Sequence, residues 1–332
     1  MNLPLPIRIL LWPFSLIYEL VVWIRGTLYA KGVLRRKRLK APVISVGNLT
    51  VGGTGKTPMV LWLAEYFLNE GKRVAILSRG YRGEGGTSDE IELLKRRLGG
   101  RVQFGVGPNR YEEGSRIENE RPVDIFLLDD GFQHIQLERD ANILMLDGSR
   151  KLSNEWLLPA GSLREPISAC RRADLIVVTR KFERPDVRAK DSHAYAIFYA
   201  ETRLLGFRKP GSNEPPIYAN ELGTGPFFGF CGIGNPAAFF TDLSRWHVPV
   251  SGTMSFRDHH RYSATDMRKL EAAAQAAGAQ SLITTEKDDQ NLAGLKFSMP
   301  LYVAVIDFVL PSESEFRITL ERLLENSQEV RN

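Results

Sequence analysis

The chain has 332 residues, of which 43% are hydrophobic and 25% are charged. This is an ordinary globular composition, and the length suffices for one large α/β domain and a smaller one. The two cysteines, Cys170 and Cys231, lie far apart in the sequence. They exclude a disulfide framework and a cysteine metal motif, and they suit a reducing compartment.

The positive charge is concentrated at one end of the chain. The formal net charge is +5, and the first 40 residues carry eight basic residues and one acidic residue. That segment therefore has a charge of +7, and the remaining 292 residues sum to −2. A nucleic-acid enzyme more often spreads its positive charge over the main domain. We therefore expect no nucleic-acid partner, and no obligate protein partner is evident.

Residues 1–40 are expected to form a membrane-association segment. Residues 5–24 are almost entirely apolar, with Trp12 and Trp23 toward the two ends, and a basic run follows at 31–40. No A-x-A-like cleavage site follows, which argues against a signal peptide. A single spanning helix and a buried core helix remain open. We favour a helix in the membrane interface with the basic run on anionic headgroups, because indole rings suit that depth.

Apolar runs next predict a parallel sheet. Strands are expected at residues 42–47, 73–78, 123–128, 142–146 and 174–179, and a helix at 58–70. Strands that alternate with helices form a parallel sheet with crossover helices, here over a first domain at 41–206. Residues 207–226 are rich in glycine and proline and are expected to form a linker.

A second, smaller α/β domain is expected over residues 227–332. The pattern there is a strand, turn and helix at 227–243, a helix at 263–279, a strand and turn at 281–288, and a strand at 300–308. No internal repeat accompanies it. The predicted fold class is therefore a P-loop NTPase-like α/β sheet with a smaller α/β domain and an N-terminal membrane helix.

A phosphate-binding loop lies between the first strand and the first helix of the sheet. Residues 45–58 read SVGNLTVGGTGKTP, and the nucleotide-binding residues expected are Gly52, Gly53, Thr54, Gly55, Lys56 and Thr57. Glycines let backbone N–H groups surround phosphate oxygens at a helix N-terminus. Lys56 would reach the β- and γ-phosphates of ATP, and the Thr57 hydroxyl would bind Mg²⁺. The loop departs from the strict pattern at Thr50, and Val51 stands where related ATPases carry a lysine.

A carboxylate pair ends another predicted strand. Asp129 and Asp130 follow four apolar residues. The carboxyl ends of parallel strands share one edge of the sheet, so these side chains should lie beside the phosphate loop, where one can hold Mg²⁺. Arg164 and Glu165 lie in a loop framed by proline and glycine, and an arginine there suits neutralisation of phosphoryl charge.

Other motifs leave their roles open. The string 78–81 (SRGY) follows a strand and could contact phosphate or substrate. Asp89 and Glu90 begin a helix, where acidic residues are expected for dipole reasons alone. His259 and His260 are adjacent and point in different directions, so one histidine paired with a carboxylate is a better interpretation than a shared metal.

These strings together resemble the lipid A 4′-kinases (tetraacyldisaccharide 4′-kinases). The resemblance rests on a series of features in chain order. They are the hydrophobic N-terminal segment, SVGNLTVGGTGKTP (45–58), SRGY (78–81), the DE pair (89–90), LLDDGFQH (127–134), LPAGSLREP (158–166), FCGIGNP (230–236), FRDHH (256–260) and TTEKD (284–288). It covers almost the whole chain.

The resemblance implies transfer of the γ-phosphate of ATP to the 4′-hydroxyl of a tetraacyl glucosamine disaccharide 1-phosphate, a lipid A precursor. It also implies that the protein is located on the cytoplasmic face of the bacterial inner membrane, as a peripheral or monotopic protein. ATP and Mg²⁺ would be the cofactors, and the acylated disaccharide phosphate and the anionic membrane surface the partners.

The resemblance also assigns roles to residues. Asp89 matches the position proposed as the base, and His259 matches its partner, although His260 remains an alternative. Lys56 and Arg164 would serve catalysis. The Mg²⁺ ligands would come from Thr57, Asp129, Asp130 and Glu90. The residues expected to contact the substrate are Arg79, Tyr81 and Glu165. Ser88 and Ile91 depart from the family's usual G-D-E-P string, which weakens the role of Asp89 as base.

Three alternatives are weighed against this interpretation. A soluble kinase or ligase similar to dethiobiotin synthetase would share the loop but has no reason to carry Trp12, Trp23 and the basic run. A membrane-bound ATPase switch usually carries the loop lysine that Val51 replaces. A DHH phosphoesterase needs several more Asp and His clusters for two metals.

Overall fold

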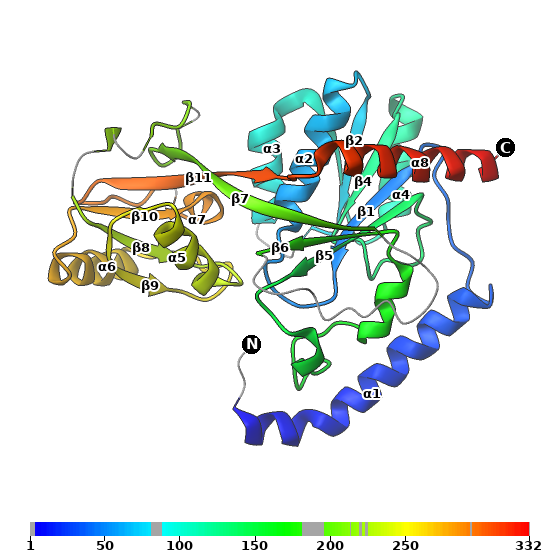
Figure 1. The fold of residues 1–332 in the computed structure, drawn as a ribbon, viewed down its shortest axis with the longest axis horizontal. Helices are drawn as coiled ribbons and strands as arrows, with labels where there is room; N and C mark the ends of the chain where they lie inside the picture. Colours follow the sequence, from blue (N-terminus) through cyan, green and yellow to red (C-terminus); the bar gives the residue numbers. More distant parts are fainter. Residues whose placement is uncertain are drawn as a thin grey trace. The chain divides into compact units, whose positions relative to one another are not determined.

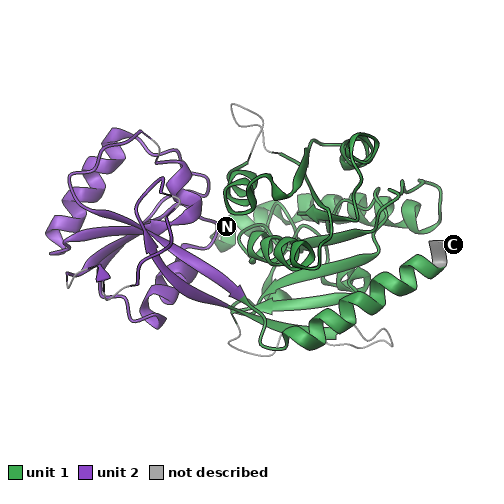
Figure 2. Cartoon of the chain, turned by 90° about the horizontal axis from the view of Figure 1, so that it is seen from above, with its two compact units in different colours: residues 1–201, 309–332 green, residues 202–308 purple. Residues whose placement is uncertain are grey.

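The computed structural model describes residues 4–80, 88–180, 196–212, 214–218, 221–222, 225–292 and 294–331. The chain folds into two compact units (Figure 2). Unit 1 comprises residues 1–201 and 309–332, and unit 2 comprises residues 202–308. The two strands that pass between the units are β7 (Ala196–Arg208) and β11 (Leu301–Val309).

Unit 1 is built on a parallel sheet (Figure 1). Its other strands are β1 (Val43–Asn48), β2 (Val74–Ser78), β3 (Gln103–Val106), β4 (Ile125–Asp129), β5 (Ala141–Asp147) and β6 (Leu175–Thr179). They lie in the order β3-β2-β4-β1-β5-β6-β7, and each neighbouring pair is parallel. Every residue of β1, β2, β4, β5 and β6 is buried, as expected where helices cover both faces.

Helices pack on both faces of this sheet. They are α2 (Lys56–Asn69), α3 (Asp89–Leu98), α4 (Arg110–Glu120) and α8 (Glu313–Arg331). The rings of Trp62 on α2 and Phe316 on α8 meet edge to face, with centroids 5.5 Å apart. On the other face, Ile117 of α4 packs with Leu77 and Phe126. The last helix of the chain therefore completes the first unit.

One close approach ties β1 to the loop after β4. A Cβ placed on Gly47 would lie 2.5 Å from both the Cβ and the backbone nitrogen of Phe132. Only glycine fits there without displacing the loop. Because this loop continues from Asp130, the packing of Gly47 against Phe132 fixes where the carboxylate pair lies relative to the phosphate loop.

The N-terminal helix α1 (Leu5–Ala30) is 26 residues long and apolar. Within the described ranges it is the one helix long and apolar enough to cross a membrane. Most of its large hydrophobic side chains are exposed, and Ser15 is its buried residue. Helix α1 therefore exposes an apolar surface along most of its length.

Unit 2 is a second α/β unit. Its strands β8 (Phe227–Cys231), β9 (Val250–Ser255) and β10 (Ser281–Thr285) join β11 in the order β11-β10-β8-β9, with parallel pairing. Its helices are α5 (Pro236–Arg245), α6 (Ala264–Ala276) and the short α7 (Glu286–Gln290). Helix α6 begins with a capping box between Ser263 and Asp266.

The predicted P-loop α/β fold and its five strands in the first domain are confirmed. The second unit differs from the predicted second domain, 227–332, at both its first and its last residue. Unit 2 begins at residue 202 within β7, not at 227, and residues 309–332 belong to unit 1 because Phe316 packs against Trp62. The segment predicted as a linker pairs in part with β7, through a bridge between Phe207 and Ile217.

Candidate active site

The phosphate loop joins β1 to α2, as predicted. Gly55 caps α2 with a left-handed conformation, φ 85°, and Gly52 has φ 115°. A Cβ on Gly55 would lie 3.1 Å from Cγ2 of Thr179, so a larger residue would be both strained and crowded. Lys56 and Thr57 occupy the first two positions of α2. Their N–H groups are therefore at the positive end of the helix, where phosphate binds.

Asp130 lies between two cations. Its carboxylate accepts hydrogen bonds from Nη1 of Arg164 at 2.8 Å, and Nζ of Lys56 lies 3.5 Å from its Oδ1. Burial opposes the charged form, but Lys56 and Arg164 outweigh it and lower the pKa of Asp130. Asp130 also has φ 49°, a left-handed conformation that costs energy in most non-glycine residues. Such strain is concentrated at functional sites.

Asp129 has the opposite electrostatic environment. It is buried, and the Ser78 hydroxyl donates to its Oδ2 at 3.4 Å. Burial raises the pKa of Asp129 to about 7, and the charges of Asp130 and Glu90 add to the rise. The two neighbouring carboxyl groups therefore differ in protonation near neutral pH. A pair of carboxyl groups whose pKa values are pushed apart is typical of an active site.

The side chain of Gln133 links the loop after β4 to the start of the phosphate loop. The sequence did not predict a role for this residue. Its Nε2 donates to the carbonyl oxygen of Asn48, at the end of β1, at 2.8 Å. Its Oε1 lies 3.4 Å from Nη1 of Arg164. Gln133 therefore holds the Asp130 loop against the start of the phosphate loop. It lies inside the LLDDGFQH string, but its contacts depend on the fold.

Arg110 is a second residue that the sequence analysis missed. It is buried at the start of α4. Burial lowers its pKa, Arg79 lowers it further, and Asp130 and Asp129 raise it. It therefore belongs to the same electrostatic cluster. A signal existed: an arginine at a helix N-terminus opposes the helix dipole, and such a local conflict often marks a functional residue.

The other predicted residues of unit 1 have varied environments. Asp89 and Glu90 begin α3 behind the N-cap residue Ser88, whose side chain accepts from the N–H of Ile91. Arg79 is exposed at the end of β2. Glu165 is buried and forms an ion pair with Arg172 at 2.6 Å. Tyr81 lies outside the described residues.

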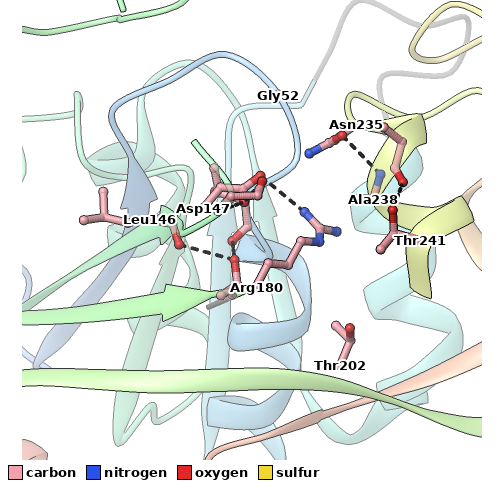
Figure 3. Close-up of polar contacts among 12 residues, drawn as sticks. Gly52, Leu146, Asp147, Arg180, Thr202, Asn235, Ala238 and Thr241 are labelled. Carbon is pink, nitrogen blue, oxygen red and sulfur yellow. Dashed lines mark hydrogen bonds and ion pairs between the residues drawn. The ribbon is translucent and has the colours of Figure 1, made fainter. Parts of the chain in front are cut away.

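The ends of β5 and β6 adjoin the phosphate loop as well. The Thr179 hydroxyl lies 3.3 Å from the carbonyl oxygens of both Thr54 and Leu146. Figure 3 shows Asp147 and Arg180, whose ion pair measures 3.4 Å. Arg180 shares with Asp130 a left-handed backbone, φ 53°. Polar groups thus gather at the carboxyl edge of the sheet, where ligands bind in open α/β folds.

The two histidines of FRDHH lie in unit 2 and have different partners. Nε2 of His260 is 3.2 Å from Oδ2 of Asp266, and its ring stacks on Phe256. His259 has φ 58°, and its Nε2 lies 3.3 Å from Nζ of Lys287. Lys287 also binds Asp258 at 2.9 Å. Packing therefore fixes the ring of His260, whereas His259 belongs to a half-exposed polar cluster.

The oxygen donors of unit 1 are compatible with Mg²⁺. Among the residues described, no group of three or more His, Cys, Asp or Glu could hold a metal. Mg²⁺ in kinases is usually bound through one or two carboxylates together with phosphate oxygens and water. Asp129, Asp130 and the Thr57 hydroxyl fit that pattern. Within the described ranges, the buried Thr54 hydroxyl and Asn48 Oδ1, both close to the loop, have no hydrogen-bond partner.

Comparison with known proteins identifies the family. The model of the tetraacyldisaccharide-1-P 4′-kinase family matches residues 7–326. A tetraacyldisaccharide 4′-kinase from Geobacter metallireducens is 40% identical over 95% of this chain and 98% of its own length. The chain belongs to the tetraacyldisaccharide-1-P 4′-kinase family. A relative from Geobacter sulfurreducens is 38% identical, over 93% of this chain and 91% of the relative.

A solved structure agrees with this assignment. The crystal structure of LpxK from Aquifex aeolicus in complex with ATP is 33% identical, with a TM-score of 0.75. The match covers 96% of this chain and 99% of that chain. The prediction of a phosphotransferase of lipid A biosynthesis is thereby confirmed. The alternatives of a soluble synthetase-like enzyme and of a non-kinase ATPase switch are excluded by family membership.

Proposed function

We propose that this kinase transfers the γ-phosphate of ATP to the 4′-hydroxyl of a tetraacyl glucosamine disaccharide 1-phosphate at the carboxyl edge of the unit 1 sheet. The observation that supports this most strongly is Asp130, held between Lys56 and Arg164 beside the phosphate loop. Phosphoryl transfer depends chiefly on positioning and on neutralising charge at the moving phosphoryl group. Lys56 and Arg164 supply two cations where that charge develops.

The nucleotide would be held by the loop 52–57. Backbone N–H groups at the start of α2 would bind phosphate oxygens, and Lys56 would turn from Asp130 toward the β- and γ-phosphates. Mg²⁺ would be held by Thr57 with Asp129 and Asp130, and Glu90 lies near enough to influence Asp129. When bound, the ion neutralises phosphate charge. Asp130, already ionised, is the better candidate for direct contact.

The acceptor hydroxyl requires a base. We assign this role to Asp89, at the first turn of α3, with His259 of unit 2 as the residue that orients it. A carboxylate can accept the hydroxyl proton as the new bond forms. His259 is a better candidate than His260, because Asp266 and Phe256 hold His260 in place. Arg79, Tyr81 and Glu165 are proposed to contact the substrate.

The membrane surface is the proposed location, on the cytoplasmic face of the bacterial inner membrane. Polar side chains of α1 contact the rest of unit 1 from Arg8 to Arg25. At 1.5 Å per residue those contacts extend over roughly 25 Å of the helix. A helix tied to a polar protein surface over that length is suited to lie in the interface rather than to span the bilayer. The basic run at 31–40 would bind anionic headgroups.

Transfer of labelled phosphate from ATP into the lipid tests the proposal. The purified protein in detergent, given Mg-ATP and the tetraacyl disaccharide 1-phosphate, should form labelled lipid. Lys56→Ala should lower the rate by at least about 100-fold, because a cation that stabilises the transition state is lost. ATP hydrolysis without labelled lipid would contradict the proposal.

The same assay tests the proposed base. Asp89→Asn removes a proton acceptor at nearly constant size and should lower kcat by about 100-fold or more. His259→Ala should lower kcat, and His260→Ala serves as the matched comparison on the neighbouring residue. Full activity in Asp89→Asn would move the base to another residue without affecting the kinase assignment.

A further inference from the structure

Four polar side chains of α1 contact loops of the same unit. They lie at positions 8, 15, 18 and 25, a spacing that places them along one side of a helix. The Ser15 hydroxyl donates to the carbonyl oxygen of Leu157 at 3.0 Å and accepts from the N–H of Ala160. The guanidinium of Arg8 lies 4.7 Å from the ring centroid of Trp156. Helix α1 is therefore docked on the loop that leads to Arg164.

The other two contacts reach residues of the proposed active site. The Tyr18 hydroxyl donates to the carbonyl oxygen of Arg164 at 2.8 Å. Nη2 of Arg25 donates to the carbonyl oxygen of Gln133 at 3.0 Å. The side chain of Arg164 binds Asp130, and that of Gln133 binds the carbonyl of Asn48. Each of these two contacts is thus one residue away from Asp130 or from Asn48, the last residue of β1 before the phosphate loop.

The loop at Arg164 is also joined to the phosphate loop through its backbone. The N–H of Arg164 donates to the carbonyl oxygen of Leu49 at 2.7 Å, and that of Val51 donates to Ser162 at 2.8 Å. Arg164 is therefore held from both sides, by Tyr18 of α1 and by Leu49. A shift of α1 would move the guanidinium that binds Asp130.

We propose that Tyr18 and Arg25 of α1 are positioning residues for phosphoryl transfer. Their hydrogen bonds to the backbone of Arg164 and Gln133 hold these two residues in place. The proposal rests on the proposed role of Arg164 and Asp130. It implies that the position of α1 on unit 1 affects the catalytic rate. Because the membrane surrounds α1 in the proposed location, the membrane would affect the rate through that position. Misplacement of a catalytic group by about 1 Å can cost large factors in rate. Neither residue touches the phosphates in this assignment.

The chemistry of Tyr18 suits this role. Burial raises the pKa of Tyr18, and the charge of Glu165 adds to the rise. The phenol therefore stays protonated and remains a hydrogen-bond donor to a carbonyl oxygen. Removing the hydroxyl alone should weaken the hold on Arg164 and leave the apolar surface of α1 intact.

The test compares Tyr18→Phe with Tyr29→Phe. Both remove one phenolic hydroxyl from α1, and the Tyr29 hydroxyl has no hydrogen-bond partner among the residues that the structure describes. One hydrogen bond corresponds to roughly a 2- to 10-fold effect, so we expect kcat of Tyr18→Phe to fall by about that factor. The KM for ATP and vesicle binding should be unchanged, and Tyr29→Phe should match the wild type.

A double-mutant cycle with Arg164→Ala separates this role from a merely structural one. If Tyr18 acts through Arg164, Tyr18→Phe should cause no further loss in the Arg164→Ala background. Fully additive losses, or a wild-type kcat for Tyr18→Phe, would overturn the proposal. Full activity of Arg164→Ala would instead overturn the proposed role of Arg164, so the two failures are distinguishable. Arg25→Gln should repeat the pattern of Tyr18→Phe.

Discussion

Asp129 and Asp130 are adjacent in sequence but have opposite pKa shifts. Asp130 has Lys56 and Arg164 as neighbours, which lower its pKa, whereas burial raises the pKa of Asp129 to about 7. Folding thus makes two chemically different groups from identical side chains. The sequence predicted the pair from its place after an apolar strand. It could not predict which member is ionised, because that depends on Arg164, 34 residues later.

The pH dependence of stability should reveal the buried carboxyl group. The pKa of Asp129 is raised from 3.8 to about 7 in the folded protein. Below about pH 4 the group is protonated in both states and has no effect. Between pH 4 and 7 only the unfolded chain loses the proton, so the folded protein loses stability, and above 7 the difference stays constant. Denaturant titrations without nucleotide should therefore show Asp129→Asn gaining stability over the wild type as pH rises to 7.

The outcome that contradicts this interpretation is a constant stability difference across that range. Asp124→Asn is the comparison variant, because the pKa shift of Asp124 is opposite in direction to that of Asp129. The Arg73 side chain holds the pKa of Asp124 down to about 2. Its stabilising contribution is lost as the pH falls below about 4, so Asp124→Asn should be least stable relative to wild type near neutral pH.

At the scale of elements, the strands and the phosphate loop could be predicted, and the contacts between loops could not. Residues 74–77 and 143–146 are apolar throughout because parallel strands are buried on both faces. Strands β3 and β9 lack such runs, and the sequence analysis missed them. The contacts of Tyr18 and Gln133 join residues 146 and 85 positions apart. No local pattern encodes such separations.

The close contact between β1 and the loop after β4 predicts a stability effect. Gly47→Ala would place a Cβ 2.5 Å from Phe132, including its backbone nitrogen. Overpacking of this kind costs about 1–3 kcal/mol of unfolding free energy. Gly100→Ala is the control, because a Cβ there meets nothing within 4 Å. Equal stability of the two variants in urea titrations would contradict the packing described here.

The exposed apolar side of α1 predicts a membrane-binding effect. Leu10 and Ile17 are 72% and 61% exposed, on a side of the helix away from Ser15. The double change Leu10→Ser and Ile17→Ser should weaken binding to anionic vesicles by at least about tenfold, since burying one such side chain contributes roughly 1.5–3 kcal/mol. Ile318→Ser removes a similarly exposed side chain from α8 and is the control. Equal losses in both proteins would argue against α1 as the membrane contact.

At the scale of the whole molecule, the chain combines a nucleotide site, a long apolar helix and a second α/β unit. The order of the motifs was readable from the sequence because each one occupies a short segment. The division into units was not, because the chain returns to unit 1 after residue 308. The packing of α8 against α2 reveals that return. Asp89 belongs to unit 1 and His259 to unit 2.

The most direct test of the proposed activity is the position of the new phosphate on the lipid. Phosphorus and proton NMR of the product formed from Mg-ATP and the tetraacyl disaccharide 1-phosphate would distinguish the candidates. A phosphomonoester on the 4′-oxygen, with the 1-phosphate unchanged, is the expected result. A pyrophosphate at position 1, or a phosphate on another hydroxyl, would contradict the assignment of this chain as a 4′-kinase.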